Sequence, residues 1–434
     1  MKKICVVGLG YVGLTLGVVL ADVGFNVVGV EKNEETVTLL NKRRSHIHEP
    51  HINFLLKKHL NRSLVIVNTI PSDEDIDTYI ICVATPIDEH KKPNLDYVRN
   101  ATTDVAKHLK KNDLIILRST VPVGTTRNVV NEIVEKNSKV KVSELSIAFA
   151  PERTLEGKAL EELRYLPQII GGLDEDGVNK AINIFVRVTN TIVRVSSIEA
   201  AELVKQIDNI YRDVNIALGN ELGMACEKLG LDAFEIISSA NMNYARNRVM
   251  VPGSGVGGAC LTKDPYLFLS QLDNIHENSI ILRSRKINEG MPGHVVSLAE
   301  NALLMNRTTL MGARVAVLGF AFKGRPETAD ARFSPTSDLI KILKNKGANI
   351  VVMDPVVPGD VIKNEAEYAS TYESAFKDTD CVIIMNNHPK WSEIDFNTYK
   401  KYLKSKAAVI DGWKMLNRSD VEKAGFVYRC VGVG

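Results

Sequence analysis

A glycine-rich turn near the start of the chain limits the fold more than any other stretch. Gly8, Gly10 and Gly13 follow the β-rich run Ile4–Val7 and precede a helical pattern of apolar residues over 14–23. This order predicts a strand, a tight turn and a helix. The first glycine permits the turn, the second lets a pyrophosphate approach the backbone, and the third lets the helix pack closely on the strand. The phosphates of a dinucleotide would then lie at the amino end of the helix.

An acidic residue after the second strand strengthens this prediction. The run Asn26–Val30 is followed by Glu31, which lies 21 residues after Gly10, where the ribose-binding acid of a dinucleotide domain belongs. A carboxylate there accepts hydrogen bonds from the ribose hydroxyls and repels a 2′-phosphate, so NAD is favoured over NADP. The neighbouring Lys32 weakens that exclusion. The alternative is a glycine turn that binds no ligand.

Three later strand-like runs also end in loops with polar side chains. Their strands and loop residues are Tyr79–Val83 with Thr85, Leu114–Leu117 with Thr120, and Leu145–Phe149 with Pro151-Glu152-Arg153. Because the carboxyl ends of the strands line the ligand crevice of a doubly wound sheet, we expect Thr85 and Thr120 to face the cofactor. Ordinary turn chemistry is the alternative.

One long helix is predicted over Ile198–Leu229, with a serine ahead of it and Gly230 after it. At about 1.5 Å per residue it spans roughly 45 Å, which is longer than one domain needs. We therefore expect it to run through the centre of the molecule and to supply a subunit interface. Lys205, Asn209 and Arg212 lie at i, i+4 and i+7 on one face of it. They are either functional groups or a solvated polar stripe.

A flexible loop with a single cysteine follows the long helix. The run Gly253-Ser254-Gly255-Val256-Gly257-Gly258-Ala259-Cys260-Leu261-Thr262-Lys263-Asp264 has four glycines within six residues, then a thiol with a lysine three residues on. Glycines adopt positive φ and bring the backbone close to a ligand, and a nearby cation stabilises a thiolate. Cys260 is therefore the candidate nucleophile. A buried structural cysteine is the alternative.

The last third of the chain repeats the opening pattern. Strand-like runs over 314–319, 349–354, 381–387 and 407–411 predict a second α/β sheet. Its first turn, Gly319-Phe320-Ala321-Phe322-Lys323-Gly324, carries bulky side chains where a dinucleotide needs glycines. We expect Lys323 and Arg332 to bind a nucleotide there instead. The chain then divides into a cofactor domain (1–196), a helical domain with the cysteine loop (197–305) and a nucleotide domain (306–434).

Composition excludes several classes of protein. The 434 residues are 45% hydrophobic and carry a formal net charge of +2 with no basic block, which argues against nucleic-acid binding. Six cysteines without a C-x-x-C pair favour reduced thiols in the cytoplasm. The first apolar run is broken by glycines and Asp22, which argues against a signal peptide or a membrane span. His46, His48 and His51 lie close together, but no second ligand pair with recognisable spacing occurs, so no metal is predicted.

The ordered set of motifs resembles the nucleotide-sugar (UDP-sugar) 6-dehydrogenases over essentially the whole chain. The matching segments are Gly8 to Leu14, Thr85-Pro86, Ser119-Thr120-Val121-Pro122, Pro151-Glu152-Arg153, the Lys205 helix, Gly253 to Asp264 and Asp330-Ala331-Arg332. The strand and helix patterns above predict an α/β fold of two Rossmann-like doubly wound domains joined by a long central helix, and a homodimer formed through that helix. The resemblance implies a four-electron oxidation of the sugar C6 hydroxymethyl to a carboxylate with two NAD+ in succession.

The resemblance also assigns residues to roles. Those implied in catalysis are Cys260, Lys205, Asn209, Asp264 and Glu152. Those implied in cofactor binding are Gly8, Gly10, Tyr11, Val12, Gly13, Glu31, Lys32, Thr85 and Thr120. Those implied in binding the UDP-sugar are Arg153, Lys205, Asn209, Arg212, Arg246, Gly257, Phe322, Lys323 and Arg332.

Details of three segments bear on the substrate. Arg153 in Pro151-Glu152-Arg153, the helix segment Tyr211-Arg212-Asp213-Val214-Asn215 and Val251-Pro252-Gly253 resemble the N-acetylhexosamine branch, which favours UDP-ManNAc or UDP-GlcNAc. In contrast, Lys263-Asp264 resembles the glucose branch, and Ala259 replaces a histidine that the N-acetylhexosamine branch often carries. Tyr244-Ala245-Arg246 likewise departs from that branch's common His-Pro-Arg. A UDP-glucose 6-dehydrogenase is the alternative. A one-step alcohol dehydrogenase with the same first domain and a non-catalytic nucleotide-sugar sensor are the further rivals.

Overall fold

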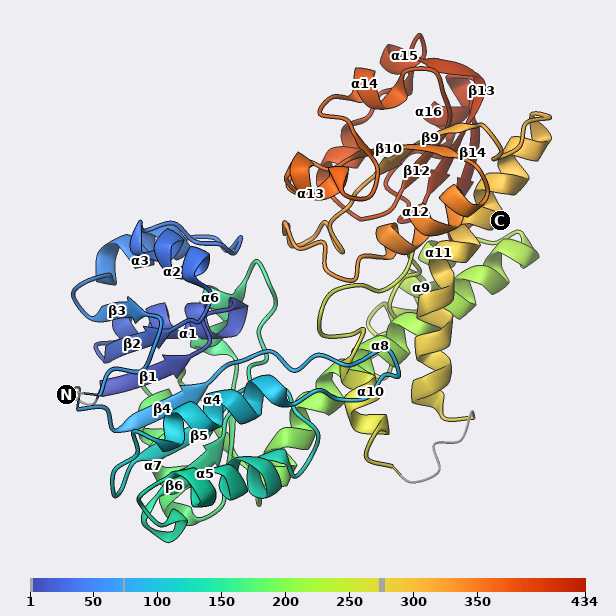
Figure 1. Ribbon diagram of the computed structural model, residues 1–434. Helices are drawn as coiled ribbons and strands as arrows, with labels where there is room; N and C mark the ends of the chain where they lie inside the picture. Colours follow the sequence, from blue (N-terminus) through green and yellow to red (C-terminus); the bar gives the residue numbers. More distant parts are fainter. Residues whose placement is uncertain (1–2, 73–74, 273–277) are drawn as a thin grey trace. The chain divides into compact units, whose positions relative to one another are not determined.

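The computed structural model describes residues 3–72, 75–272 and 278–434. The chain forms two compact units. The first comprises residues 1–208 and 266–275, and the second comprises 209–265 and 276–434. Each unit is built around one sheet (Figure 1).

The first unit has an eight-stranded sheet in the order β3-β2-β1-β4-β5-β6-β7-β8. All neighbouring strands are parallel except the β6–β7 pair. The chain runs outward from β1 in one direction through β3 and then returns to β4 on the other side of β1, which is the doubly wound arrangement. The strands are β1 (Lys3–Val7), β2 (Asn26–Val30), β3 (Leu64–Val67), β4 (Thr78–Ile81), β5 (Leu114–Leu117), β6 (Ser146–Phe149), β7 (Gln168–Gly172) and β8 (Ile192–Arg194).

Helices cover both faces of this sheet. Alternate residues of β1 point to opposite faces, so Ile4 and Val6 join one apolar core and Cys5 and Val7 join the other. The first core includes α1 (Tyr11–Asp22), α3 (Ile52–His59), α6 (Ala159–Tyr165) and α7 (Glu175–Phe185), and the second includes α4 (Asp96–Ala106) and α5 (Asn131–Asn137); α2 spans Glu34–Asn41.

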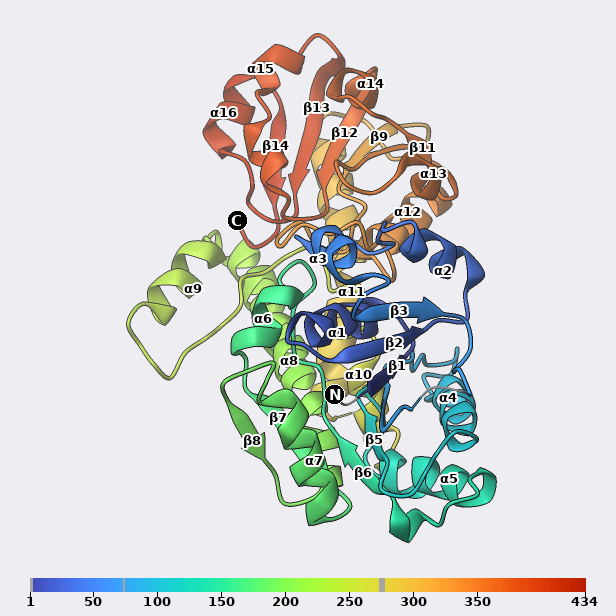
Figure 2. The same ribbon diagram turned by 90° about the vertical axis from the view of Figure 1, so that its left-hand side faces the viewer.

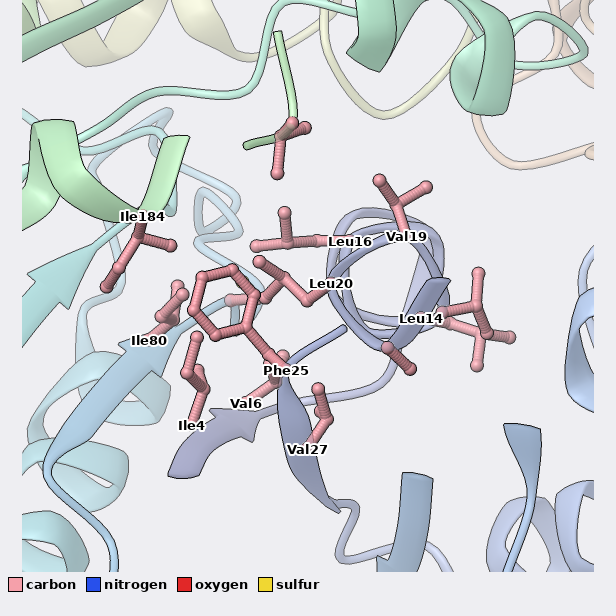
Figure 3. Close-up of a cluster of buried hydrophobic side chains, with 14 of the residues drawn as sticks. Ile4, Val6, Leu14, Leu16, Val19, Leu20, Phe25, Val27, Ile80 and Ile184 are labelled. Atoms are coloured by element: carbon pink, nitrogen blue, oxygen red, sulfur yellow. The ribbon is translucent and has the colours of Figure 1, made fainter. Parts of the chain in front are cut away.

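The ring of Phe25 lies at the centre of the first core. Leu16 and Leu20 point toward it from α1, and Ile4, Ile80 and Ile184 surround its other side (Figure 3). Phe25 directly precedes β2, so it closes the core where the chain leaves α1 and enters the sheet. This packing holds the amino end of α1, where the glycine turn lies, in a fixed place on the sheet.

Asp22, the last residue of α1, links three helices through charge. Its carboxylate accepts hydrogen bonds from Lys58 and from the ring of His59 on α3, at 2.6 and 3.0 Å, and from Arg164 on α6 at 2.6 Å. Partial burial acts to raise the pKa of Asp22, but these hydrogen bonds outweigh it and lower the pKa to about 2. The ionised carboxylate therefore stabilises the fold of the first unit.

Replacing Asp22 by asparagine is expected to destabilise the first unit by about 2 kcal/mol at neutral pH, because a depressed carboxyl pKa contributes stability above the pKa of the unfolded chain. That contribution is lost as the pH falls through the folded pKa. The difference from wild type should therefore shrink as the pH is lowered from about 5 toward 2.

Denaturant unfolding at several pH values, followed by circular dichroism, measures this difference. The fluorescence of Trp391 and Trp413, both in the second unit, is the internal reference. A gap between variant and wild type that stays constant from pH 7 to the acid limit would contradict the role of the Asp22 charge.

The long helix α8 spans Ile198–Leu229, as predicted, with 32 residues. The division between the two units falls within it, after Asp208. Its first turns pack in the first unit, where Ile198 and Ala201 belong to the second core. Glu202 accepts hydrogen bonds there from the backbone of Gly124 and Thr126 at 2.5 and 2.8 Å. The helix is thus continuous from the first unit into the second.

The second unit has a six-stranded sheet in the order β11-β10-β9-β12-β13-β14, with all neighbouring strands parallel. The strands are β9 (Arg314–Leu318), β10 (Asn349–Met353), β11 (Glu367–Tyr368), β12 (Thr379–Ile384), β13 (Leu403–Asp411) and β14 (Val427–Cys430). The order repeats the winding of the first sheet around its first strand. The predicted fold, two Rossmann-like doubly wound sheets with a long central helix, is therefore confirmed.

Two helical layers enclose the second sheet (Figure 2). One face packs against α11 (Ile280–Met305) and α12 (Pro335–Asn345), and the other packs against α14 (Tyr372–Phe376), α15 (Phe396–Tyr399), α16 (Arg418–Lys423) and the buried Trp391. The remaining α-helices of the described chain are α9 (Ala233–Asn241), α10 (Asp264–Leu269) and α13 (Gly359–Lys363). Figure 2 shows α9 and the segment after it projecting away from the body of the second unit.

Most predicted strands agree with the structure to within three residues at either end. The first helix begins at Tyr11, three residues before the start of the apolar pattern, with Gly10 as its N-cap. The reason is that Tyr11, Val12 and Gly13 already have helical geometry, although a glycine-rich stretch has no apolar period to show it. No helix within the described parts of the chain combines the length and the apolar character that crossing a membrane requires.

Candidate active site

The three glycines of the first turn differ in what surrounds them. Gly8 has φ of 88°, which favours glycine. A Cβ on Gly13 would lie 1.8 Å from the carbonyl oxygen of Gly8, so only glycine lets the helix approach the turn this closely. A Cβ on Gly10 would meet no protein atom within 4 Å. Since the fold does not require a glycine at position 10, the residues fit a site where a ligand takes that space.

Glu31 lies directly beside this turn. One carboxylate oxygen accepts the backbone N–H of Leu9 at 3.0 Å, and the other accepts that of Asn33 at 3.0 Å. The acid therefore stabilises the turn and stands where a ribose would lie. The amine of Lys32 forms an ion pair with Asp104 at 2.8 Å. This pair partly neutralises the cation next to Glu31 and so favours a cofactor without a 2′-phosphate.

The two predicted threonine loops lie side by side at the carboxyl ends of β4 and β5. The buried hydroxyl of Thr85 donates to the carbonyl of Thr120 at 2.6 Å. The hydroxyl of Ser119 donates to the carbonyl of Val83 at 2.7 Å. These bonds join the loops next to the strand-order reversal between β1 and β4, where doubly wound sheets bind ligands.

Glu49 is a site residue that the sequence did not reveal. Its buried carboxylate accepts the hydroxyl of Tyr11 and the backbone N–H groups of Gly157 and Leu160, the latter two at 2.8 and 3.3 Å. It thereby ties the first turn of α1 to the loop after β6. The neighbouring His46, His48 and His51 do not belong to a cluster of three or more potential metal ligands in the described residues. Only the burial of Glu49 reveals its role, and no sequence period predicts that burial.

Arg118 holds the segment Pro151-Glu152-Arg153 in place. Its guanidinium, which is only 2% exposed, donates to the carbonyls of Ala150 and Pro151 at 2.8 and 3.2 Å and to the side chain of Gln168 at 2.9 Å. Burial lowers the pKa of Arg118, and the charge of Glu152 acts in the opposite direction. An arginine in this place fixes the start of the loop that carries the predicted carboxylate.

The two charged residues of that segment have different surroundings. The partly exposed Glu152 accepts the backbone N–H of Thr154. Arg153 forms a two-pronged ion pair with Asp208 on α8, with the closer contact at 2.7 Å. The predicted substrate-binding arginine is therefore anchored to the long helix.

The glycines of the cysteine loop meet protein rather than open space. A Cβ on Gly253 would lie 2.7 Å from the ring of Trp413, and a Cβ on Gly257 would lie 2.8 Å from Phe322. Gly255 and Gly258 have φ of 128° and 86°. The glycine run therefore lets the loop pack tightly against the carboxyl-end loops of the second sheet. Gly257 and Phe322, both predicted to bind substrate, are brought together by this packing.

Cys260 lies in the turn that leads into α10, and its side chain is exposed. The other five cysteines are all buried. Burial raises the pKa of three of them well above the usual value, to about 12 for Cys82 and higher for Cys381 and Cys430. Cys260 is thus the thiol of this chain that is accessible for nucleophilic attack, and the buried structural alternative does not hold.

Asp264, at the first turn of α10, is fully buried. Its two carboxylate oxygens receive the side-chain amide of Asn209 at 2.5 Å and the amine of Lys263 at 2.5 Å. Asn209 and Asp264, both predicted as catalytic, are therefore in direct contact. The lysine expected beside the thiolate forms an ion pair with the carboxylate.

The three polar residues on one face of α8 divide by exposure. Lys205 and Asn209 are buried, at 7% and 3% exposure, whereas Arg212 is exposed. Among the residues that the structure describes, no carboxylate lies within ion-pairing distance of the Lys205 amine. Burying a cation without a counter-ion costs free energy, so a structural role does not explain this lysine. Of the three side chains, Arg212 is the one in contact with solvent.

The first turn of the second sheet differs from the glycine turn of the first. The buried carboxylate of Asp354, at the end of β10, accepts four backbone N–H groups: those of Phe320, Ala321, Val356 and Val357, at 2.7 to 2.9 Å. It therefore stabilises the turn and has no capacity left for a ribose, unlike Glu31.

Three predicted cations belong to loops of the second unit. Lys323 lies over the ring of Phe322, with 5.4 Å between its amine and the ring centroid. Arg332 is exposed and forms an ion pair with Asp330 at 2.6 Å. Arg246 is exposed and donates to the hydroxyl of Tyr244 at 3.1 Å. Lys323 and Arg332 both follow β9, which is compatible with binding one diphosphate.

Comparison with known sequences assigns three successive parts of the chain to one family. The chain matches the UDP-glucose/GDP-mannose dehydrogenase family in three parts: the NAD binding domain over residues 2–189, the central domain over 199–290 and the UDP binding domain over 316–418. The fold and the glycine turn thus define an NAD-dependent dehydrogenase, which confirms the predicted cofactor and enzyme class.

Full-length similarity extends to individual proteins. The chain is 33% identical over 434 residues to a UDP-N-acetyl-D-mannosamine dehydrogenase of Pyrococcus horikoshii, covering 100% of this chain and 99% of that one. The solved structure of a UDP-D-ManNAc dehydrogenase from the same organism superimposes with a TM-score of 0.91 at 32% identity, covering 99% of both chains. A UDP-glucose dehydrogenase structure from Pyrobaculum islandicum gives 0.88 at 28% identity, covering 100% of this chain and 98% of that one. The chain belongs to the UDP-glucose/GDP-mannose dehydrogenase family.

Proposed function

We propose that this protein oxidises the C6 hydroxymethyl of a UDP-N-acetylhexosamine to a carboxylate in two steps through a covalent intermediate on Cys260. The observation that carries the proposal is the combination of an exposed Cys260 with Asp264, four residues further along the chain, which is hydrogen-bonded to Asn209 on α8. A dehydrogenase with one oxidation step needs no such nucleophile. The UDP-uronic acid formed would serve as a precursor for polysaccharide or glycan synthesis.

The first unit supplies the cofactor site. The backbone of Gly8 to Gly13 and the amino end of α1, whose first residues are Tyr11 and Val12, would hold the pyrophosphate. Glu31 accepts the ribose hydroxyls, and the joined loops of Thr85 and Thr120 line the crevice beside it. When bound, NAD+ accepts the hydride that leaves C6 in each oxidation.

Lys205 and Asn209 act on the oxygen at C6. The ammonium of Lys205 stabilises the alkoxide that develops as the C6 hydroxyl loses its proton. The amide of Asn209 has two hydrogens, of which one is bound to Asp264, so the second is available for the same oxygen. Loss of a hydride from C6 then leaves an aldehyde.

Cys260 carries the second oxidation. Its thiolate adds to the aldehyde carbon and forms a C–S bond, giving a thiohemiacetal whose loss of a second hydride leaves a thioester. Water then cleaves the C–S bond and releases the carboxylate and the thiol. Asp264 positions this water, and Glu152 is the candidate base that takes its proton.

The remaining charged residues bind the substrate. Lys323 and Arg332 bind the diphosphate, with Phe322 and Gly257 shaping the same loop contact. Arg153, Arg212 and Arg246 bind the sugar and the rest of the nucleotide. The relatives named above support the N-acetylhexosamine assignment, because UDP-N-acetyl-D-mannosamine is the substrate in the name of one that matches the whole chain. UDP-glucose is the alternative substrate.

We also propose a homodimer formed through α8. The helix carries five exposed large apolar side chains: Ile207, Tyr211, Leu218, Leu222 and Leu229. Their spacings of four and seven residues place them along one stripe, as in helix pairs that associate. The second unit also exposes Ile236 on α9 and Met242 and Tyr244 on the segment that follows α9. Sedimentation of the purified protein as a monomer at micromolar concentration would contradict this proposal.

A reducing compartment, the cytoplasm, fits the thiol chemistry. All six cysteines are free, and the proposed reaction needs the Cys260 thiol reduced. Thiol titration of protein isolated under acid quench should count six free thiols per chain. A blocked Cys260 in freshly isolated protein would argue against this location.

The NADH formed per sugar consumed tests the reaction and the substrate together. The purified protein is offered UDP-ManNAc, UDP-GlcNAc and UDP-glucose separately, and NADH is followed by absorbance. We expect two NADH per sugar, with one of the N-acetylhexosamines strongly preferred. One NADH per sugar would instead support a one-step alcohol dehydrogenase. No NADH with any of the three sugars would support a non-catalytic nucleotide-sugar sensor.

A further inference from the structure

Residues 248–252, the segment that leads into the cysteine loop, lie along α8. Asn215 donates to the carbonyl of Arg248 at 2.6 Å and accepts the backbone N–H of Met250 at 3.0 Å. A Cβ on Gly219 would lie 2.1 Å from the carbonyl oxygen of Met250, so the segment touches the helix backbone. Close contact of this kind fixes where the segment crosses α8.

The segment ends at a buried hydrogen bond. The backbone N–H of Gly253, the first residue of the loop, donates to the side-chain oxygen of Asn220 on α8 at 2.9 Å. Asn220 is fully buried, and its NH2 group donates to the side-chain oxygen of Asn288 on α11 at 2.9 Å. Both ends of the Asn220 amide are therefore bonded.

Asn288 is in turn bonded to a buried ion pair. Its NH2 group donates to the side-chain and backbone oxygens of Asp213 at 2.8 and 2.9 Å. The carboxylate of Asp213 also receives the guanidinium of Arg285 at 2.5 Å. Asp213, Asn288 and Arg285 are all at most 1% exposed. The four side chains form one continuous chain of contacts from Arg285 to the backbone of Gly253.

The donors and acceptors in this series of hydrogen bonds permit only one orientation of the two amide side chains. A carboxylate only accepts, so Asn288 must turn its NH2 group toward Asp213. The oxygen of Asn288 then faces Asn220, so Asn220 must donate a hydrogen bond to it from its own NH2 group. The oxygen of Asn220 therefore faces Gly253. Only in this orientation can Asn220 accept the hydrogen bond from the backbone N–H of Gly253. A flipped Asn220 would set its NH2 group against the Gly253 N–H and its oxygen against the oxygen of Asn288, so these buried groups would be unpaired.

We infer that Asn288, acting through Asn220, is a positioning residue for the Cys260 loop. Within the described parts of the chain, no hydrogen bond joins Asn288 to a residue of the loop. Asn288 nevertheless determines the orientation of the Asn220 amide. This inference rests on the proposed role of Cys260 as nucleophile.

The loop has little freedom to absorb an error at Gly253. The next residue, Ser254, donates to the carbonyl of Met385 at 2.5 Å and accepts the indole N–H of Trp413 at 3.0 Å. The start of the loop is therefore held between α8 and the second sheet, seven residues before the thiol. Displacement of a reacting group by about 1 Å lowers a rate by up to about 100-fold.

Replacing Asn288 by alanine tests the inference in the full-length protein. Deuterium uptake in the peptide covering 250–261 should rise roughly tenfold in rate, because the acceptor of the Gly253 N–H is free to flip. The kcat for the UDP-sugar should fall about 10-fold or more, while the Kd for NAD+ stays unchanged. Unchanged uptake, or raised uptake with unchanged kcat, would overturn the inference.

A double-mutant cycle with Asn220→Ala separates positioning from general destabilisation. If Asn288 acts through Asn220, the double variant should show no more uptake at 250–261 than Asn220→Ala alone. Additive effects would overturn the inference. Thr379→Val is the matched control, because it removes one buried hydrogen bond, to Ala375 at 3.0 Å, at the amino end of β12 in the same unit. It should lower stability without changing uptake in the loop or kcat.

The proposed function is tested independently by Cys260→Ser. Steady turnover by that variant would refute the role of the cysteine whatever the exchange data show. Normal exchange behaviour in Asn288→Ala, with an inactive Cys260→Ser, would refute only the positioning role.

Discussion

Replacing Cys260 by serine is expected to abolish steady production of the uronic acid while leaving UDP-sugar binding close to wild type. A serine hydroxyl forms its alkoxide at neutral pH far less readily than a thiol forms a thiolate, so the covalent step fails. We expect kcat to fall by about three orders of magnitude or more. The first oxidation does not need the thiol, so rapid mixing should still show at most one NADH per active site.

The structure supplies a matched control for this variant. Cys226 lies on α8 in the same unit as Cys260, but its side chain is buried. Cys226→Ser therefore changes a thiol that is not accessible to solvent or substrate. It should cost some stability and retain turnover. Calorimetric titration with the UDP-sugar measures binding in both variants. Multiple turnovers by Cys260→Ser would remove the cysteine from the mechanism.

Replacing Gly13 by alanine is the second variant with a large expected effect. The added methyl group would lie 1.8 Å from the carbonyl oxygen of Gly8 and 3.2 Å from the side chain of Cys82. The backbone in the first contact is held in place by the hydrogen bond from the Gly8 N–H to the Val30 carbonyl at 2.8 Å. The turn therefore cannot move away from the methyl group without losing free energy of folding. We expect destabilisation of the first unit by about 3 kcal/mol and loss of NAD+ binding.

Gly10→Ala is the comparison that isolates the ligand from the fold. A methyl group there meets no protein atom within 4 Å, so stability should change little. Binding of NAD+ should nevertheless weaken, because the second glycine of the turn is where a pyrophosphate approaches the backbone. Thermal unfolding with and without NAD+ distinguishes the two variants. Equal NAD+ affinity for Gly10→Ala and wild type would show that the pyrophosphate does not use this turn.

Strong local patterns explain which elements could be predicted. The strands Asn26–Val30 and Leu114–Leu117 and the helix Ile198–Leu229 have the predicted ends, because each is a continuous apolar or periodic run bounded by turn residues or caps. The helices α9 and α11 were not predicted. In α11 the apolar residues are interrupted by Arg285 and Asn288, which are buried by pairing with Asp213 on α8 rather than by hydrophobicity. In α9 the buried residues are Ala233 and Ile237, too few to form an apolar period.

Site residues divide in the same way. Gly10, Glu31 and Cys260 could be proposed as site residues from the sequence, because a motif of fixed spacing predicts the chemistry of each. Glu49 and Arg118 could not, because each acts by bonding to backbone groups of segments distant in sequence. A buried polar residue looks like an exposed one until its partners are known.

The two doubly wound sheets, the dinucleotide turn and the long helix could be predicted from the sequence, since these depend on local period and spacing, and the motif around Cys260 led to its proposed role as nucleophile. Only the tertiary structure decided that the glycines of the cysteine loop pack against Trp413 and Phe322, that Asp264 is bonded to Asn209 and Lys263, and that Gly253 is bonded through Asn220 and Asn288 to a buried ion pair. Those relations join segments tens of residues apart. They arise because a buried polar group must find a partner wherever the fold provides one.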